Sequence, residues 1–320
     1  MVEISLICTV YNEGESIRDL LDSIVEQTRI PDEAVFVDAG SEDQTQEIIE
    51  EYQEEHDWIR LIIDEGCNIA EGRNTAVENA ENDYIVGTDG GCIVDEKWCE
   101  AMEKAFEEGY EALSGLFQPR HENIFEYVQG QLRAHYVRPE NVPNNWPPSS
   151  RSIGFTRQVW EEAGGYPEHL YTGEDSKFNS NVRRAGYEWN VVREAMVYWE
   201  MRPTWKSYWK QFRQYGEGDA RAGNLFDYPG KVFGVSKVFL RISTTALALS
   251  GLILSVWNLL FLLFLPAGFA PQYASKLSAL KQCLDEEGIK TVPYWMVLIP
   301  FASVAHLYGY CKEKLRLLNK

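Results

Sequence analysis

Four groups of polar residues near the N-terminus follow or accompany short apolar runs and could carry chemistry. Thr9-Val10-Tyr11-Asn12-Glu13 follows the first run and Asp38-Ala39-Gly40-Ser41 the second, Gly72-Arg73-Asn74 lies in a helical pattern, and Thr88-Asp89-Gly90-Gly91 ends a later run. Carboxylates in such places can bind a hard divalent cation or accept a proton. Each group also has a simpler explanation, because Asp, Asn and Gly at strand ends more often form turns.

The elements that would position these groups alternate along residues 1–110. The predicted strands are 4–10, 34–37, 59–63 and 84–87, and the predicted helices are 16–27, a helix capped by Ser41 that runs to about residue 56, and one capped by Asn68. This alternation predicts an α/β fold with a mostly parallel sheet and helices on both faces. Ligands of such sheets bind beyond the carboxyl ends of the strands, where the four groups would gather.

In order and spacing, these groups resemble the inverting family 2 glycosyltransferases of the GT-A type. The resemblance covers roughly residues 3–220 and rests on TVYNE, VDAGSEDQT, GRNTA before NDYIVGTDGG, SIGFTRQVWEEAGGYPE and YTGEDSKFNSNVRRAGY. It implies a Rossmann-like domain in which residues 1–110 bind the nucleotide sugar and residues 111–200 form the acceptor and catalytic half. Residues 201–242 and 243–320 lie largely outside it.

The resemblance also implies a role for each candidate residue. Asp175, which follows Gly173 and Glu174, would be the catalytic base, and Asp89 would hold Mg²⁺ or Mn²⁺. The implied substrate-binding residues are Thr9, Tyr11, Glu13, Asp38, Arg73, Asp89 and Glu174. The chemistry is consistent, because a cation stabilises a diphosphate leaving group and inversion needs one carboxylate to deprotonate the acceptor hydroxyl. Alternatively, Glu174 and Asp175 simply place negative charge at a helix N-terminus.

This sequence departs from the family pattern at three places. Ala39 stands where VDDGS has its second Asp, and Gly91 stands where the Asp-x-Asp element has its second carboxylate, so a usual metal ligand is missing. The stretch 211–215, QFRQY, lacks the Arg-Trp pair of the Gln-x-x-Arg-Trp motif that processive synthases carry. We therefore expect transfer of a single sugar rather than synthesis of a polymer.

Charge divides the sequence into two unlike parts. The 320 residues contain 49 acidic and 30 basic side chains, a net charge of −19 that argues against nucleic acid as a partner. Residues 1–110 hold 30 acids and 6 bases, a balance of −24, whereas the remainder holds 19 acids and 24 bases, a balance of +5. The basic part is best explained by anionic lipid headgroups. None of the six cysteines has the spacing of a zinc site.

The last third of the sequence has the features of a membrane-bound segment. Residues 201–242 are predicted to form amphipathic interfacial helices, because aromatic side chains from Trp205 to Tyr215 follow one helix face and basic residues the other. Alternatively, this aromatic stripe packs on the catalytic domain's own core. Residues 243–320 are predicted to be a transmembrane helical hairpin with spans at 243–265 and 292–310. The first span has 23 uncharged residues, about 34 Å of helix, and a buried core helix is its alternative.

The second span contains Pro293, Pro300 and His306, so it could cross the bilayer or be re-entrant. Basic residues outside both spans favour cytoplasmic ends. The sequence therefore predicts an enzyme at the cell membrane, with its catalytic domain facing the cytoplasm.

This enzyme would move one sugar from a UDP- or GDP-sugar to a lipid-linked acceptor, such as a polyprenyl phosphate or a lipid-linked saccharide, in cell-envelope or glycoprotein glycan synthesis. Its expected partners are the nucleotide-sugar donor, a lipid-linked or other saccharide acceptor, and membrane lipids. Two alternatives remain. Ala39 and Gly91 are compatible with a catalytically degenerate GT-A membrane scaffold. A sugar nucleotidyltransferase is disfavoured, because it would have a glycine-rich basic loop in place of Asn12-Glu13-Gly14-Glu15.

Overall fold

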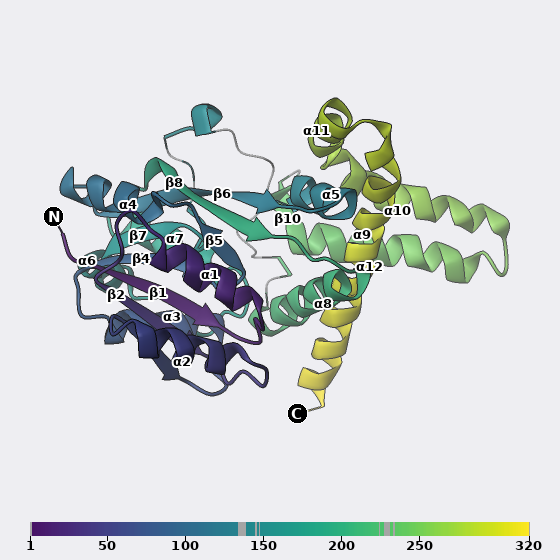
Figure 1. Cartoon of the computed structure of the whole chain (residues 1–320). Helices are drawn as coiled ribbons and strands as arrows, with labels where there is room; N and C mark the ends of the chain where they lie inside the picture. The colour runs from purple at the N-terminus through teal and green to yellow at the C-terminus, as the bar shows by residue number, and fades with distance from the viewer. Residues whose placement is uncertain are drawn as a thin grey trace. The chain divides into compact units, whose positions relative to one another are not determined.

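The computed structural model describes residues 2–133, 139–144, 146, 148–223, 225–226, 231–232 and 234–319. The chain divides into two compact units (Figure 1). The sheet unit comprises Met1–Pro119, Tyr136–His169 and Glu174–Glu200. The helical unit comprises Arg120–His135, Leu170–Gly173 and Met201–Lys320.

The sheet unit contains the alternating strands and helices that the apolar periodicity predicts. Its strands are β1 (Ile4–Val10), β2 (Glu33–Asp38), β3 (Ile59–Ile63), β4 (Tyr84–Asp89), β5 (Cys92–Val94), β6 (Ala112–Arg120), β7 (Ile153–Thr156) and β8 (Asn190–Glu200). Its helices are α1 (Ser16–Val25), α2 (Thr45–Glu55), α3 (Ile69–Asn79), α4 (Trp98–Glu107), η1 (Pro139–Asn141), α6 (Arg157–Ala163) and α7 (Glu174–Arg184).

These strands form one mixed sheet in the order β3-β2-β1-β4-β7-β6-β8-β5. The first four are parallel neighbours, as predicted, and the register places Thr9 of β1 beside Asp89 of β4. The later strands include antiparallel pairs, β7 with β4 and β6, and β5 with β8. Only Gly90 and Gly91 separate β4 from β5, and β5 pairs with β8 rather than with β4.

Both faces of the parallel strands are covered. Ile7 and Val35 pack in one cluster with Ala76 of α3 and Phe178 of α7. Leu6, which points to the other face of β1 because side chains alternate along a strand, is equally buried. Burial on both faces is typical of parallel sheets.

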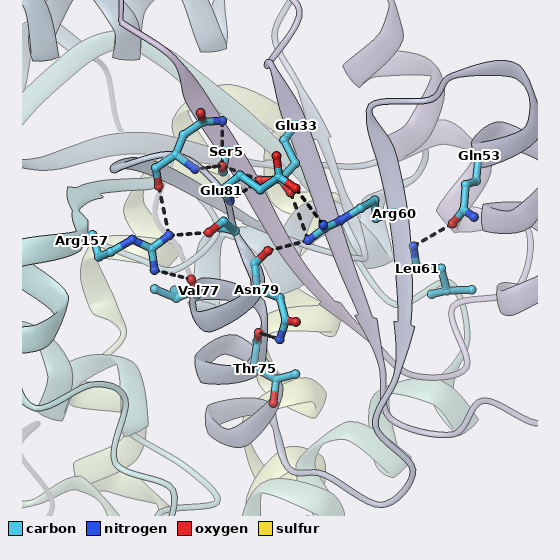
Figure 2. Close-up of polar contacts among 12 residues, drawn as sticks. Ser5, Glu33, Gln53, Arg60, Leu61, Thr75, Val77, Asn79, Glu81 and Arg157 are labelled. Atoms are coloured by element: carbon cyan, nitrogen blue, oxygen red, sulfur yellow. Dashed lines mark hydrogen bonds and ion pairs between the residues drawn. The ribbon is translucent and has the colours of Figure 1, made fainter.

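A polar network closes the end of the sheet at which β1 and β2 begin (Figure 2). The Ser5 hydroxyl donates to the Glu33 carboxylate at 2.7 Å, and Arg60 lies 3.1 Å from the same carboxylate. The Arg157 guanidinium donates to the Val77 carbonyl at 2.7 Å and so satisfies a carbonyl near the end of α3. These charged residues hold the sheet together at the end opposite to the candidate site.

The helical unit consists mainly of helices. They are α5 (Ile124–Arg133), α8 (Trp205–Ala222), α9 (Lys237–Leu254), η2 (Leu259–Leu263), α10 (Phe264–Ala274), α11 (Leu277–Glu287), η3 (Ile289–Thr291) and α12 (Val292–Leu318), with the short strands β9 (Lys231–Val232) and β10 (Val235–Ser236). Glycines let α8 and α12 approach closely. A Cβ on Gly216 would lie 2.0 Å from the carbonyl oxygen of His306, and one on Gly309 would lie 2.0 Å from that of Arg213.

The aromatic stripe of α8 packs inside the helical unit. Tyr208 and Phe212 are buried, and the rings of Trp205 and Trp209 lie 5.1 and 5.2 Å from Phe301 of α12. This helix face therefore packs on α12, within the helical unit. The stripe contributes to the fold of the helical unit, and its buried members are not available to lipid.

The uncharged run 243–265 is not one continuous helix, and this corrects the predicted first span. Helix α9 ends at Leu254, and the Asn258 side chain then accepts from the Leu260 amide at 2.9 Å, so the chain turns. α10 returns beside α9 (Figure 1), and Gln272 donates to the hydroxyls of Thr244 at 2.8 Å and Thr245 at 3.0 Å. By length and composition, two segments, Lys237–Leu254 and Ile289–Leu318, could cross a membrane.

Candidate functional site

The loops that follow β1 and β2 are joined by hydrogen bonds. The Asn12 amide donates to the Ser41 hydroxyl at 2.8 Å, and the Asn12 side chain accepts from the Glu42 amide at 2.8 Å. The Glu13 amide donates to the Thr45 hydroxyl at 3.0 Å. Asn12 has φ 53°, a left-handed conformation that asparagine tolerates better than most residues. The first two predicted motifs thus form one continuous wall.

The side chain of Asp38 fixes the conformation of the loop after β2, which forms part of this wall. Its buried carboxylate accepts from the amides of Gly40 at 2.9 Å and Ser41 at 2.7 Å, from the Ser41 hydroxyl at 2.6 Å and from Gln46 at 2.7 Å. The prediction that Ser41 caps the following helix is wrong, because α2 begins at Thr45 and Ser41 instead closes the Asp38 turn. Within the described residues, the polar contacts of Asp38 are those of a loop-forming residue.

Arg73 is placed by the start of α3. Asn68 caps this helix, as predicted, and forms a capping box with Glu71. Gly72 lets the helix lie against β1, since a Cβ there would come within 2.6 Å of the Thr9 methyl carbon. Thr9 is thereby held between strand and helix, and its buried hydroxyl has no hydrogen-bond partner among the residues that the structure describes. The side chain of Arg73 follows on the buried face of the helix.

Arg73 joins two predicted carboxylates that are far apart in sequence. Its Nη2 lies 2.8 Å from Oδ1 of Asp89 at the end of β4, and its Nη1 lies 3.0 Å from Oε1 of Glu174 at the start of α7. The guanidinium carbon also lies 5.4 Å from the ring centre of buried Tyr166. Three of the predicted site residues are therefore in direct contact.

Burial and charge act in opposite directions on these three groups. Burial alone would lower the pKa of Arg73, but Asp89 and Glu174 outweigh it and raise that pKa, so the guanidinium stays charged. Burial would raise the pKa of Asp89, yet Arg73 and then Arg151 lower it. For Glu174 burial prevails over Arg73, and the pKa of this carboxyl is raised. Asp89 is the firmly ionised member of the two acids.

Arg151 belongs to this site and was not predicted. Its Nε lies 3.8 Å from Oδ2 of Asp89, and its guanidinium carbon lies 4.0 Å from the ring centre of Trp199 and 5.4 Å from that of Phe117. Asp89 thus faces two arginines. The residues that place Arg151 come from β6 and β8, so the surrounding Ser149-Ser150-Arg151-Ser152 sequence carries no local signal for the role.

Glu13 occupies the space next to the glycines after β4. A Cβ built on Gly90 would lie 2.9 Å from Cγ of Glu13, and one on Gly91 would lie 3.6 Å from its Oε2. Glu13 therefore brings a carboxylate to the place where the Asp-x-Asp element has its second one. Among the described residues, His, Cys, Asp and Glu side chains form no ready-made cluster of three or more for a metal. Asp89 and Glu13 are the two carboxylates that fit such an ion.

Asp175 is half-buried in the first turn of α7. Its Oδ1 accepts from the Ser176 amide at 2.5 Å, and its charge helps to raise the pKa of Arg73. While Glu174 is tied to Arg73, the neighbouring Asp175 keeps part of its surface accessible. Tyr11, the remaining predicted residue, is 52% exposed at the tip of β1.

Comparison with known proteins identifies relatives of this chain. Residues 5–162 match the sequence model of "Glycosyl transferase family 2". Glycosyltransferase AglE of Haloferax volcanii is 28% identical over 221 residues, which are 66% of this chain and 71% of AglE. The uncharacterized glycosyltransferase EpsJ of Bacillus subtilis is 26% identical over 211 residues, 62% of this chain and 61% of EpsJ.

A solved structure, the mannosyltransferase PcManGT of Pyrobaculum calidifontis with GDP-Man and Mn²⁺, has a similar fold. Its TM-score is 0.57 at 18% identity, covering 98% of this chain and 87% of PcManGT. The predicted GT-A-like α/β fold and the predicted enzyme class are confirmed. Residues 5–162, the segment that carries Arg73, Asp89 and Arg151, form a glycosyl transferase family 2 domain.

Proposed function

We propose that the protein transfers a single sugar, with inversion, from a UDP- or GDP-sugar to an acceptor hydroxyl. The observation that carries this proposal is the bridge of Arg73 between Asp89 and Glu174. It ties the end of β4, where a donor would bind, to the turn that presents Asp175. Asp175 would accept the acceptor proton, and one such base suffices for a single displacement.

Two arginines of the site would stabilise the leaving group. When the bond from sugar to phosphate breaks, negative charge develops on the nucleoside diphosphate. Arg73 and Arg151, both held in place by carboxylate and aromatic contacts, supply fixed positive charge near Asp89. Charge that is oriented before the reaction stabilises a transition state without further reorganisation.

A divalent cation would add to this stabilisation. Asp89 and Glu13 would hold Mg²⁺ or Mn²⁺, because such hard cations prefer carboxylate oxygens. When bound, the ion would act as a Lewis acid toward the diphosphate. The Mn²⁺ and GDP-Man in the PcManGT complex support the use of a divalent cation with a nucleotide sugar.

The acceptor proposed here is lipid-linked, either a polyprenyl phosphate or a lipid-linked saccharide, and the enzyme would work at the cytoplasmic face of the cell membrane in cell-envelope or glycoprotein glycan synthesis. Two features of the helical unit support a membrane location. It contains two segments long and apolar enough to cross a bilayer, and no charged residue lies between Arg241 and Lys276.

The test compares wild-type protein with Asp175→Asn on a panel of nucleotide sugars, with Mn²⁺ and a membrane lipid extract. We expect turnover to fall by about 10²–10⁴-fold while donor affinity, measured by calorimetry, stays unchanged. Asp19→Asn, an exposed carboxylate of α1, is the matched control and should keep full turnover. Unchanged turnover in Asp175→Asn would refute the base assignment. No turnover by wild type on any donor would favour the scaffold alternative.

A further inference from the structure

The turn between α9 and α10 exposes apolar side chains around most of its surface. Val256 and Trp257 are 84% and 75% exposed. In η2 four leucines are exposed, Leu259, Leu260, Leu262 and Leu263. Because a 3-10 helix has about three residues per turn, these leucines cover two of its three sides. The apolar surface therefore wraps around the tip of the hairpin instead of forming one docking face.

Polar groups at this tip are bonded within the hairpin itself. The Asn258 amide donates to the Leu254 carbonyl at 3.2 Å, and the Asn258 side chain accepts from the Leu260 amide at 2.9 Å. The Ser255 hydroxyl donates to the Leu252 carbonyl at 2.7 Å. Since hydrocarbon offers no water as a partner, polar groups that enter it need such internal bonds. The turn is thus built as a lipid environment requires.

The hairpin is shorter than a bilayer core and returns to its starting point. Thirteen residues of helix separate Arg241, the last charge of α9, from Leu254, about 20 Å at ~1.5 Å per residue. The hydrocarbon core measures ~30 Å. Gln272, near the end of α10, donates to Thr244 and Thr245, near the start of α9. Both arms therefore begin and end on one side of any bilayer that the tip enters.

The other candidate segment, α12, is accompanied by a charged helix. The ring of Trp209 in α8 lies 5.2 Å from that of Phe301 and 6.3 Å from that of Tyr308, near the middle of α12. Lys206 and Lys210, on either side of Trp209 in the sequence, are exposed. If α12 crossed a bilayer, these lysines would lie near its centre, where charged side chains are costly.

We propose that the protein is monotopic, with the α9–α10 hairpin inserted among the acyl chains of one leaflet and α12 outside the hydrocarbon together with α8. Lipid is the occupant of the tip, because the apolar surface wraps around it and its polar groups are bonded internally. The proposal rests on the membrane location proposed above. It assigns one re-entrant hairpin to the membrane in place of two spans.

The first experiment labels single cysteines with a membrane-impermeant maleimide, on intact cells and on inverted membrane vesicles. The full-length parent carries Cys67→Ser and Cys311→Ser, because the other four cysteines are buried. Val256→Cys reports on the hairpin tip. Ile289→Cys, at a position that is 82% exposed just before α12, is its matched control. Restoring Cys311 provides a second probe, near the end of α12.

We expect Ile289→Cys and Cys311 to be labelled from the same side of the membrane. Labelling of Val256→Cys should be lost from both sides and recovered after denaturation in SDS. The second experiment attaches a fluorophore to purified Val256→Cys and to purified Ile289→Cys. Phosphatidylcholine vesicles that carry a quencher on their acyl chains should quench the fluorophore at the tip and not the one at the control position.

Four outcomes would contradict the proposal. Labelling of Ile289→Cys and Cys311 from opposite sides would mean that α12 crosses the membrane. Labelling of Val256→Cys from the side opposite to Ile289→Cys would mean that the hairpin crosses it, and labelling from the same side would place the tip in water. Protection without quenching would mean that a second copy or another protein covers the tip.

Sugar turnover by the parent, measured on the same vesicles, tests the proposed enzymatic function separately. Turnover combined with any of these four outcomes refutes the monotopic arrangement alone. The expected labelling without turnover on any donor refutes the enzymatic function alone.

Discussion

At the scale of single residues, Arg73 shows how one buried cation can organise several anions. It contacts Asp89 and Glu174 at 2.8 and 3.0 Å, and the whole set lies where solvent is largely excluded. Removing one partner from such a set is costly, because the remaining charge stays buried without compensation. The same arrangement explains why Asp89, facing a second arginine, remains ionised while the pKa of Glu174 is raised.

The proposed role of Glu13 as a ligand of the divalent cation can be tested by substitution. Glu13→Gln should weaken Mn²⁺ binding in the presence of a nucleoside diphosphate by about tenfold or more, because it removes one of two anionic ligands. Glu13→Gln with Gly91→Asp should restore binding, since the aspartate returns a carboxylate beside the one that was lost. Calorimetry or the Mn²⁺ resonance signal measures the affinity directly. Equal affinity in wild type and Glu13→Gln would show that Glu13 is not a ligand.

Some of these residues could be predicted from sequence and others could not. Asp89 and Glu13 lie at or after the ends of apolar runs. Because the carboxyl ends of parallel strands meet at one edge of a sheet, their proximity could be predicted. Arg151 sits in an irregular turn, and its role depends on aromatic residues of β6 and β8 that only the folded chain brings near. Nor does local sequence show that Asp38 directs its carboxylate into its own loop.

At the scale of elements, α8 holds the segment that leads to Asp175. Asp219 of α8 accepts from the Thr172 hydroxyl at 2.7 Å and lies 2.8 Å from Nε2 of His306 of α12. A Cβ on Gly218 would lie 2.5 Å from the Thr172 methyl carbon, so helix and segment are in close contact. Thr172 stands three positions before Asp175 in the sequence, so we expect its attachment to limit the movement of the turn.

Thr172→Val should therefore lower kcat by about tenfold, because a hydrogen bond to a charged group contributes about 1.5–3 kcal/mol. The donor affinity should not change, since Thr172 is a positioning residue. Thr172→Ser keeps the hydroxyl and should retain most of the turnover. A rate measurement at saturating donor, combined with a thermal unfolding curve, distinguishes this loss from general destabilisation. Equal kcat in the valine and serine variants would refute the role.

The turn of the α9–α10 hairpin could not be predicted from hydropathy. The uncharged run 243–265 was long enough for a span, and composition alone does not reveal where such a run turns. The turn depends on Asn258, which caps η2, and on Gly251, where a Cβ would lie 2.7 Å from Cβ of Phe264. The approach of Gly251 to Phe264 joins residues on opposite arms, so it becomes visible only when both helices are placed.

At the scale of the whole molecule, charge and apolar surface are distributed unevenly along the chain. The first 110 residues carry a balance of −24 and the remainder +5, and the exposed apolar tip lies in the second part. The net charge of −19 would suggest an acidic protein in solution. The distribution favours a protein whose C-terminal part interacts with an anionic surface.

Charged substitutions at the hairpin tip test whether the hairpin attaches the protein to the membrane. Val256→Asp combined with Trp257→Asp should move the protein from the membrane fraction toward the soluble fraction, because each carboxylate would have to leave water with the tip. Fractionation of cells followed by immunoblotting measures the change. Leu284→Asp, on the exposed side of α11, is the control and should leave the distribution unaltered. Complete retention of the tip variant at the membrane would show that the hairpin is not the anchor.

The joined loops after β1 and β2 have a consequence for affinity. Hydrogen bonds of Asn12, Ser41 and Thr45 connect the two loops, and these bonds require no bound donor. The conformational entropy of ordering both loops is therefore lost during folding, before any donor arrives. A donor that binds against this wall orders little further chain, so more of its contact free energy is retained as affinity.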